Sequence, residues 1–200
     1  MRCILVCGAP ASGKSTLARA LAERLSLPMM SKDDVKEILF DTVGFASRAE
    51  KVALGEAAMR MLYAFAEAMM RAGQPFILEN NFESASRPGL ERLLAAYSCR
   101  PIEVFCSCEL RTLYTRFAAR ESDPSRHRGH VVNTRYPEPE GERAASQPAS
   151  FEQFAASIQA RGMLDFTVSA ERIVVDTTDF AGVDDREVAG RVGALMRTVD

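Results

Sequence analysis

The chain has 200 residues, of which 47% are hydrophobic and 26% charged, and its formal net charge is −2 at neutral pH. That length and composition suit one α/β domain with a full core, and the slightly acidic balance disfavours broad attraction to nucleic acid or to an anionic membrane. The apolar runs are shorter than a membrane span, and Met1-Arg2 leads directly into the first predicted strand. We therefore expect a cytoplasmic protein without a signal peptide or a membrane segment.

A strand, a glycine-rich loop and a helix open the chain. The strand is predicted over 2–7, and the helix carries Leu17, Leu21 and Leu25 on one stripe. Between them lies the spacing G-x-x-x-x-G-K-[ST] of a phosphate-binding loop, made of Gly8, Ala9, Pro10, Ala11, Ser12, Gly13, Lys14, Ser15 and Thr16. The glycines let backbone N–H groups point inward at a helix N-terminus, which forms a cradle for an anion. We expect Lys14 to reach the β- and γ-phosphates of a bound nucleoside triphosphate and Ser15 to bind Mg²⁺.

Strands and helices alternate along the rest of the chain, which predicts a parallel sheet with helices on both faces. Further strands are predicted at 29–30, 76–79, 102–106 and 172–176, and a long helix over 47–71. Ser31 and Asp34 are expected to form a capping box at a helix that begins at Lys32, and Val52 to face the core. No linker or internal repeat is visible, so a single domain should span 1–200.

Residues 121–148 interrupt the pattern with Pro and Gly, and Arg residues outnumber acidic residues in and just before this stretch. Long irregular segments in compact domains are usually functional. A basic segment that contains Arg128 is expected to form a lid over the phosphates and to help bind a substrate. His127 and His130 are better interpreted as polar loop residues than as metal ligands.

Polar residues follow three of the predicted strands, at the carboxyl edge where open α/β sheets bind their ligands. They are Asp33-Asp34, Glu79-Asn80-Asn81 and Asp176-Thr177-Thr178. A carboxylate at the end of a buried strand is costly unless it has a function, which favours Glu79 as a site residue. Asn81 is a candidate for contact with a substrate, whereas Asn80 can be a turn residue.

The phosphate loop, the segment 31–36, the segment 79–82 and the pair Arg116 and Arg120 together resemble small P-loop kinases. The likeness covers about residues 1–180 and is greatest to the polynucleotide 5′-hydroxyl kinase and AAA_33-like group, with adenylate, gluconate and chloramphenicol kinases and zeta toxins as relatives. It implies a three-layer P-loop NTPase sandwich with a five-stranded parallel sheet of order 2-3-1-4-5 and a lid.

The resemblance also implies roles for single residues. Asp33 matches the base that accepts a proton from an acceptor hydroxyl, and Lys36 replaces the Arg of that family pattern, which loses a bidentate fork. Glu79 stands where Asp is usual and would hold Mg²⁺ through a water molecule. Arg116 would pack on adenine, and Arg120 would neutralise the transferring phosphoryl group. Thr177 matches the adenine-side loop, although a plain turn explains it equally well.

These observations predict an ATP- and Mg²⁺-dependent phosphotransferase that acts on a hydroxyl of a small-molecule or nucleotide-like acceptor. Two alternatives stay open. One is a P-loop NTPase or nucleotide-dependent switch that acts on a protein partner, and the other is a nucleic-acid 5′-hydroxyl kinase. The phosphotransferase is favoured over a switch by Asp33, Glu79 and the basic lid, because a switch needs no base for an acceptor. The sequence does not name the acceptor.

Overall fold

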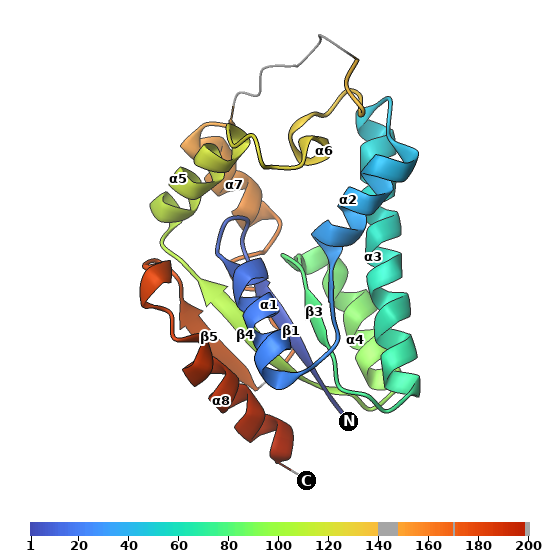
Figure 1. Cartoon of the computed structure of the whole chain (residues 1–200), viewed down its shortest axis with the longest axis vertical. Helices are drawn as coiled ribbons and strands as arrows, with labels where there is room; N and C mark the ends of the chain where they lie inside the picture. Colours follow the sequence, from blue (N-terminus) through green and yellow to red (C-terminus); the bar gives the residue numbers. More distant parts are fainter. Residues whose placement is uncertain (140–147, 170, 199–200) are drawn as a thin grey trace.

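A five-stranded parallel sheet forms the centre of the molecule (Figure 1), seen in a computed structural model that describes residues 1–139, 148–169 and 171–198. Its strands are β1 (Arg2–Gly8), β2 (Met29–Ser31), β3 (Ile77–Glu79), β4 (Arg100–Ser107) and β5 (Arg172–Asp176). They lie in the order β2-β3-β1-β4-β5, and every neighbouring pair is parallel. The predicted fold class and strand order are confirmed.

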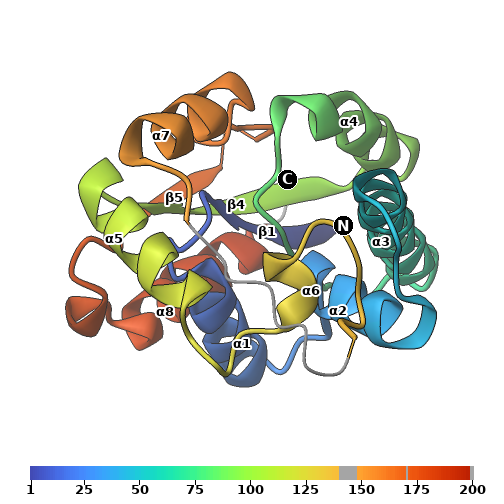
Figure 2. The ribbon, with the colours of Figure 1, turned by 90° about the horizontal axis from the view of Figure 1, so that it is seen from above.

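Helices cover both faces of this sheet. They are α1 (Lys14–Leu25), α2 (Lys32–Val43), α3 (Arg48–Arg71), α4 (Arg87–Ala96), α5 (Leu110–Glu121), α6 (Arg128–Val131), α7 (Phe151–Ala160) and α8 (Asp185–Arg197), with short 3₁₀ turns η1 (Ser84–Ser86) and η2 (Phe180–Gly182). Seen from above, α1 and α8 lie on one face of the sheet, and α3, α4 and α7 on the other (Figure 2). In the described part of the chain, no helix is both long and apolar enough to cross a membrane.

The central strand β1 is an unbroken apolar run in the sequence because both of its faces are buried. Ile4 and Val6 are buried in the cluster under α1 and α8, whereas Cys3, Leu5 and Cys7 are buried in the cluster under α3 and α4. A strand covered on both faces has no polar side, so its pattern does not alternate. Burial of each large apolar side chain stabilises the fold by about 1.5–3 kcal/mol, which holds the carboxyl edge of the sheet in place.

Two local expectations for the helices are wrong. Ser31 caps α2 by accepting a bond from the Asp34 N–H, but the Asp34 carboxylate pairs with Arg19 at 2.9 Å instead of closing a capping box. Val52 on α3 is 46% exposed, whereas Leu62 on the same helix is completely buried. In the same turn, Lys51 is buried and Leu54 packs against the cluster of Phe40 and Phe45, so Val52 lies on the face of α3 turned away from these contacts.

Part of the predicted lid is packed against the neighbouring α2–α3 pair. We call residues 126–138 the docked segment; it contains α6 and lies beside α2 at the top of the molecule (Figure 1). Phe40 and Phe45 bury Val132 between them, and the backbones of Phe45 and Tyr136 exchange two hydrogen bonds of 2.8 Å. The Lys51 ammonium donates to the carbonyl oxygens of His130 and Val132. Residues 140–147 of the predicted lid lie outside the described residues.

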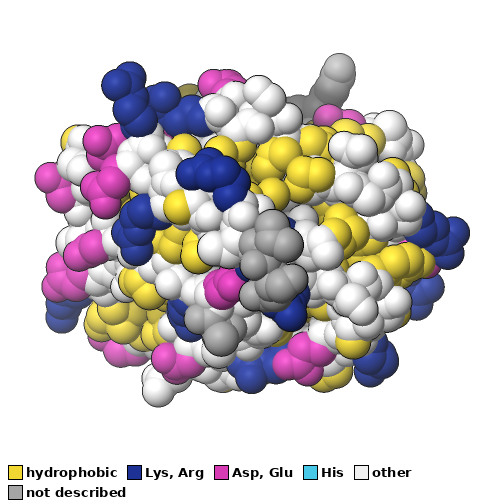
Figure 3. Space-filling model, turned by 90° about the horizontal axis from the view of Figure 1, so that it is seen from below, with side chains coloured by type: hydrophobic (Ala, Val, Ile, Leu, Met, Phe, Trp, Pro, Cys, Tyr) yellow, Lys and Arg dark blue, Asp and Glu magenta, His cyan; other side chains and the backbone are white. Residues whose placement is uncertain are grey.

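The opposite end of the molecule has a different surface. Viewed from below, the described part of this face mixes Lys and Arg with Asp and Glu, and hydrophobic side chains lie between them (Figure 3). Charges of both signs are interspersed, as on an ordinary solvated surface. The polar groups that carry chemistry lie at the other end, where the strands finish.

Candidate functional site

The phosphate loop joins β1 to α1 and has the backbone that its glycines allow. Gly8 and Gly13 have φ angles of 148° and 81°. A Cβ at Gly8 would lie 2.7 Å from both the Cys106 carbonyl oxygen and Ser12 Oγ, and one at Gly13 would collide with the ring of Phe180. Ser12 is completely buried, and its hydroxyl has no hydrogen-bond partner among the described residues. A buried hydroxyl beside inward-curled backbone fits an anionic ligand, because such a ligand would satisfy it.

Glu79 joins the phosphate loop to the second strand. Its Oε1 accepts a 3.2 Å hydrogen bond from Ser15 and lies 3.8 Å from Lys14 Nζ. Its Oε2 accepts a 2.6 Å hydrogen bond from Ser31, which is its register partner on β2. Glu79 is 1% exposed and Lys14 5%, so both charges are held in a poorly solvated place. Buried charges persist only when they are paired and hydrogen bonded, as these are.

The same residues fit a magnesium ion. The Ser15 hydroxyl and the Glu79 carboxylate supply hard oxygen atoms next to the phosphate cradle, and Mg²⁺ prefers oxygen ligands together with retained water. Sequence reasoning assigned Ser31 only as a helix cap. Its second contact, with Glu79, depends on the pairing of β2 with β3, and no local pattern reveals such a pairing.

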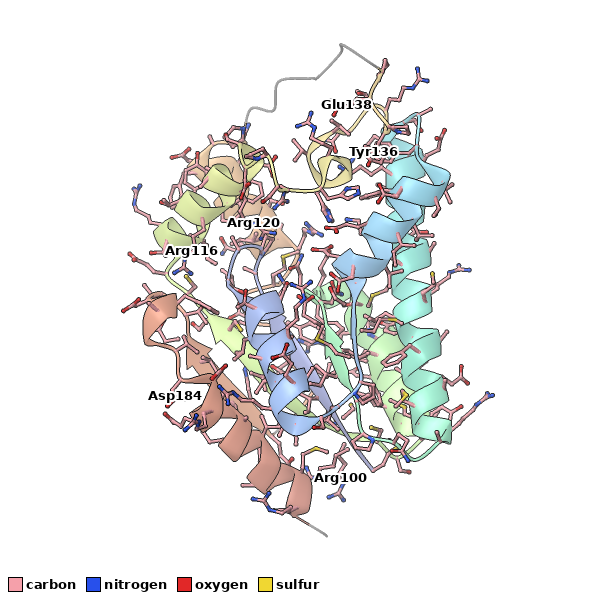
Figure 4. The ribbon with its side chains drawn as sticks, viewed as in Figure 1. Arg100, Arg116, Arg120, Tyr136, Glu138 and Asp184 are labelled. Atoms are coloured by element: carbon pink, nitrogen blue, oxygen red, sulfur yellow. The ribbon has the colours of Figure 1, made fainter. Side chains whose placement is uncertain are left out.

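A cavity of about 520 Å³ lies beside the phosphate loop, between α1 and α5, and is lined by Ala11, Gly13, Lys14, Ser15, Thr16, Arg19, Arg116, Ala119 and Arg120. Figure 4 shows Arg116 and Arg120 on α5, on the side of that helix nearest the phosphate loop. Arg120 is exposed at the end of α5. The structure therefore brings both predicted arginines to the same cavity as Lys14.

Arg116 is already bonded within the protein. Its guanidinium donates to the carbonyl oxygens of Thr177 and Thr178 at 2.8 and 2.9 Å. The Thr177 side chain is buried and donates to the Ser107 carbonyl at 2.9 Å. These contacts fix the loop after β5 against α5. The hydroxyl, the N–H and the carbonyl oxygen of Thr177 thus all have partners within the protein, so Thr177 holds the loop in shape and its predicted contact with a nucleotide stays a prediction.

The other part of the edge, where the sequence predicts contacts with an acceptor, is built by the start of α2 and the end of β3. The Asp33 carboxylate is half exposed and lies 4.0 Å from Lys36 Nζ. Burial alone would raise the pKa of Asp33, but the electrostatic interactions of its carboxylate with His130, Lys36 and Lys14 outweigh burial and lower that pKa below its usual value. Asp33 is thus ionised at neutral pH, as a proton acceptor must be.

Asn80 and Asn81 differ in their surroundings. Asn80 is buried, and its side-chain oxygen accepts a 2.8 Å bond from the N–H of Asn81, which fits the expected turn. The Oδ1 atom of Asn81 is buried and has no hydrogen-bond partner among the described residues. Asn81 and Asp33 each lie two residues beyond the paired positions Glu79 and Ser31, so they belong to one part of the edge.

The docked segment uses its polar residues for internal contacts. Arg128 forms two hydrogen bonds of 2.7 Å with Glu138, so its predicted contact with a substrate would require that pair to open. His127 lies 3.0 Å from Asp41, and His130 lies 2.9 Å from Glu37, so both histidines connect the segment to α2. Burial lowers the pKa of His130 to about 3, although the charge of Asp33 opposes this shift. The sequence did not reveal these contacts, nor the burial of Lys51 beneath the segment.

A phosphate loop between the first strand and helix of a sheet with this order defines the P-loop nucleotide-binding class, in the form found in small kinases. The chain belongs to the AAA_33 family, an AAA domain whose family model matches residues 3–135.

Curated relatives include uncharacterized proteins of Mycobacterium tuberculosis (strain H37Rv) and Mycobacterium bovis, each 33% identical over 132 residues. That match covers 60% of this chain but only 26% of each relative, so the chain spans about a quarter of their length.

Solved structures show the same fold. A candidate kinase from Chloroflexus aurantiacus is 29% identical, with a TM-score of 0.79 over 96% of this chain and 97% of that one. A gluconokinase from Sinorhizobium meliloti is 16% identical, with a TM-score of 0.54 over 96% of this chain and 89% of that one. The adenosine phosphosulfate (APS) kinase of Mycobacterium tuberculosis is 17% identical, with a TM-score of 0.54 over 98% of each chain. At this identity the last two show the fold alone, and the predicted resemblance to small P-loop kinases is confirmed.

Proposed function

We propose that the protein transfers the γ-phosphoryl group of ATP to a hydroxyl group of a small-molecule acceptor. The observation that carries this proposal is the Glu79 bridge, which joins Lys14 and Ser15 of the phosphate loop to Ser31, two residues before Asp33. Through Glu79 at the end of β3, the bridge connects the phosphate loop after β1 to the start of α2 after β2, where the Asp33 carboxylate lies. A nucleotide-dependent switch needs the phosphate loop but has no use for that carboxylate.

The proposed reaction assigns one role to each of these side chains. The acceptor oxygen forms a bond to the γ-phosphorus as the bond from that phosphorus to the β,γ-bridging oxygen breaks, and ADP leaves. The acceptor proton passes to the Asp33 carboxylate late in the transfer. Lys14 stabilises the charge on the β- and γ-phosphates, and Arg120 stands at the cavity rim where it can do the same. Ser15, with Glu79 acting through water, would hold Mg²⁺, which supplies further charge neutralisation when it is bound.

On the nucleotide side, Arg116 lines the cavity, and its bonds to the loop after β5 hold its guanidinium in place. A base that packs on Arg116 would contact the plane of the guanidinium, a surface suited to stacking. The proposed role of Arg116 is therefore to bind the nucleotide while it also holds the loop.

A screen for ADP release that depends on the acceptor tests the proposal. Purified protein is mixed with Mg²⁺ and ATP and with a library of hydroxyl metabolites, and a 5′-hydroxyl oligonucleotide and a protein extract serve as separate arms. We expect ADP release to rise with one class of small hydroxyl compound and the phosphorylated product to appear by mass spectrometry. Stimulation by the oligonucleotide alone, or by protein without any phosphorylated small molecule, contradicts the proposal.

A further inference from the structure

Three polar groups at the part of the sheet edge that follows β2 and β3, or within electrostatic range of Asp33, have fewer partners than their burial requires. Lys36 is 20% exposed, and its ammonium has only the 4.0 Å contact with Asp33 and a position 5.4 Å from the centre of the Phe40 ring. Arg126 is 15% exposed and lies 3.5 Å from Glu121, while its buried Nε has no hydrogen-bond partner in the described chain. Asn81 Oδ1 is the third such group.

The Asp33 carboxylate interacts electrostatically with both Lys36 and Arg126. Burial lowers the pKa of Lys36, and the charge of Asp33 opposes this shift. Burial and the charge of Arg120 lower the pKa of Arg126, while Glu121 and Asp33 raise it. Two poorly solvated cations thus lie within electrostatic range of one carboxylate, and an added anion would stabilise both.

The other cations near the docked segment are committed elsewhere. Arg48 donates to Asn133 at 2.9 Å, Lys51 to the carbonyl oxygens already described, and Arg161 to the Glu83 carboxylate. Each of these has a partner that accounts for its position. Lys36 and Arg126 differ from these three cations, because neither side chain makes a hydrogen bond in the described part of the chain.

We infer that the acceptor is itself an anion: a small hydroxyl compound with a carboxylate or phosphate group that Lys36 and Arg126 hold, while its reacting hydroxyl lies between Asp33 and Asn81. This inference rests on the proposed phosphotransferase function. The chemistry of the site accounts for both ends of such a molecule. A guanidinium and an ammonium bind carboxylate or phosphate oxygens, and the free Asn81 Oδ1 accepts a hydrogen bond from a hydroxyl.

The test compares matched compounds by isothermal titration calorimetry on protein saturated with Mg²⁺ and a non-hydrolysable ATP analogue, which keeps anions out of the phosphate loop. The pairs are glycerol 3-phosphate with glycerol, and gluconate with sorbitol. We expect the anionic member of at least one pair to bind about 10-fold tighter or more than its neutral counterpart, the scale of one charge-assisted hydrogen bond. The two pairs separate a phosphate from a carboxylate as the preferred group.

Variants then assign the binding to the two cations. Lys36→Gln and Arg126→Gln should each weaken the anionic compound by about 10-fold to 100-fold and leave the neutral one unchanged, and Lys36→Arg should restore much of the loss. Arg135→Gln is the matched control, because Arg135 lies exposed on the same segment and loses the same charge. Thermal unfolding checks that each variant is folded.

The outcomes separate the inference from the function on which it rests. Three results would overturn the anionic acceptor. They are equal binding of the charged and neutral members of each pair, no binding of any member, and a loss of affinity in Arg135→Gln as large as in the Lys36 and Arg126 variants. If an anionic compound binds through Lys36 and Arg126 but never accelerates ADP release from ATP, the anion site stands and the phosphotransferase proposal is wrong. If neutral compounds are phosphorylated as fast as anionic ones, the function stands and this inference fails.

Discussion

The nucleotide side and the acceptor side of this site are built in different ways. On the nucleotide side, Lys14 and Ser15 are each already paired with Glu79, and Arg116 holds the loop after β5 through two carbonyl oxygens. On the acceptor side, Lys36 and Asn81 have few or no hydrogen-bond partners.

The difference separates a rigid site from one that a ligand completes. Preorganised groups lose little entropy when they bind, and they are positioned in advance for the charge that develops in the transition state. Groups without partners instead depend on a particular ligand to satisfy them, so they discriminate among ligands. Under the proposed function, we expect the nucleotide side to stabilise the transferring phosphoryl group, and the acceptor side to supply the base Asp33 and to determine which molecule is used.

The largest expected effect is on the preorganised side. Lys14→Ala removes a buried ammonium that neutralises phosphate charge, and we expect the transfer rate to fall by about 10³-fold or more. Steady-state ADP release measures the rate, and circular dichroism confirms the fold. Near-normal turnover in a folded variant would show that the phosphate loop is not the catalytic centre.

Asp33→Asn tests the base. It keeps the size of the side chain but removes its charge, and we expect transfer to fall by about 10²-fold with little change in the affinity for ATP. Because the pKa of Asp33 is lowered from 3.8, its ionised form persists as the pH falls, and the acid limb it produces in the wild-type rate should lie below that value. Asp34→Asn is the control, since Asp34 pairs with Arg19 at the surface. A collapse of ATP binding in Asp33→Asn, with normal transfer from bound ATP, would place Asp33 on the nucleotide side.

Lys51→Met tests whether the docked segment depends on its buried contacts. Loss of the ammonium leaves the carbonyl oxygens of His130 and Val132 without their donor, which should cost about 1–3 kcal/mol of stability. Hydrogen exchange should accelerate over 126–138, whereas Arg60→Met, at an exposed position on the same helix, should change nothing there. Unchanged exchange in Lys51→Met would mean that the other contacts of the segment, among them the cluster of Phe40, Phe45 and Val132 and the two histidine contacts with α2, hold it without Lys51. The same measurement with an ATP analogue tests the predicted lid: its closure requires added protection across the lid when the analogue binds.

The smallest effects separate the two arginines of α5. Arg116→Ala should weaken nucleotide binding by about 1–2 kcal/mol, because it removes a stacking surface and frees the loop after β5. Arg120→Ala should mainly lower the transfer rate, because its charge matters most when phosphoryl charge is redistributed. Titration with a fluorescent ATP analogue and single-turnover kinetics distinguish the two. If both variants change only the affinity for the acceptor, the nucleotide lies elsewhere.

The sequence predicts the fold well because its strongest signals are local. The apolar strands, the phosphate loop and the cap at Ser31 each lie within a few neighbouring residues, and the strand order follows from the family that these residues resemble. The contacts that it misses join distant parts of the chain. Ser31 meets Glu79 only because β2 pairs with β3, and Lys51 looks like any charged residue on a helix until the docked segment covers it. The prediction that Val52 faces the core is wrong in the opposite direction, since Val52 is apolar but exposed. An apolar residue is buried only if another element of the fold packs on it.

The packing of residues 126–138 on α2 and α3 has a consequence for how acceptor preference can be transplanted between related proteins. Asp33, Lys36 and Arg126 come from two stretches of chain that are held together by Phe40, Phe45 and Lys51. If only one stretch is exchanged, the Val132 side chain or the Lys51 ammonium contacts residues from the other protein, which do not match it. A chimera that exchanges 32–71 and 126–138 together should keep its melting temperature and acquire the donor's acceptor, whereas each single exchange should melt at a lower temperature. Residues 32–71 and 126–138 would then evolve together as one unit, while the nucleotide-binding part of the chain need not change.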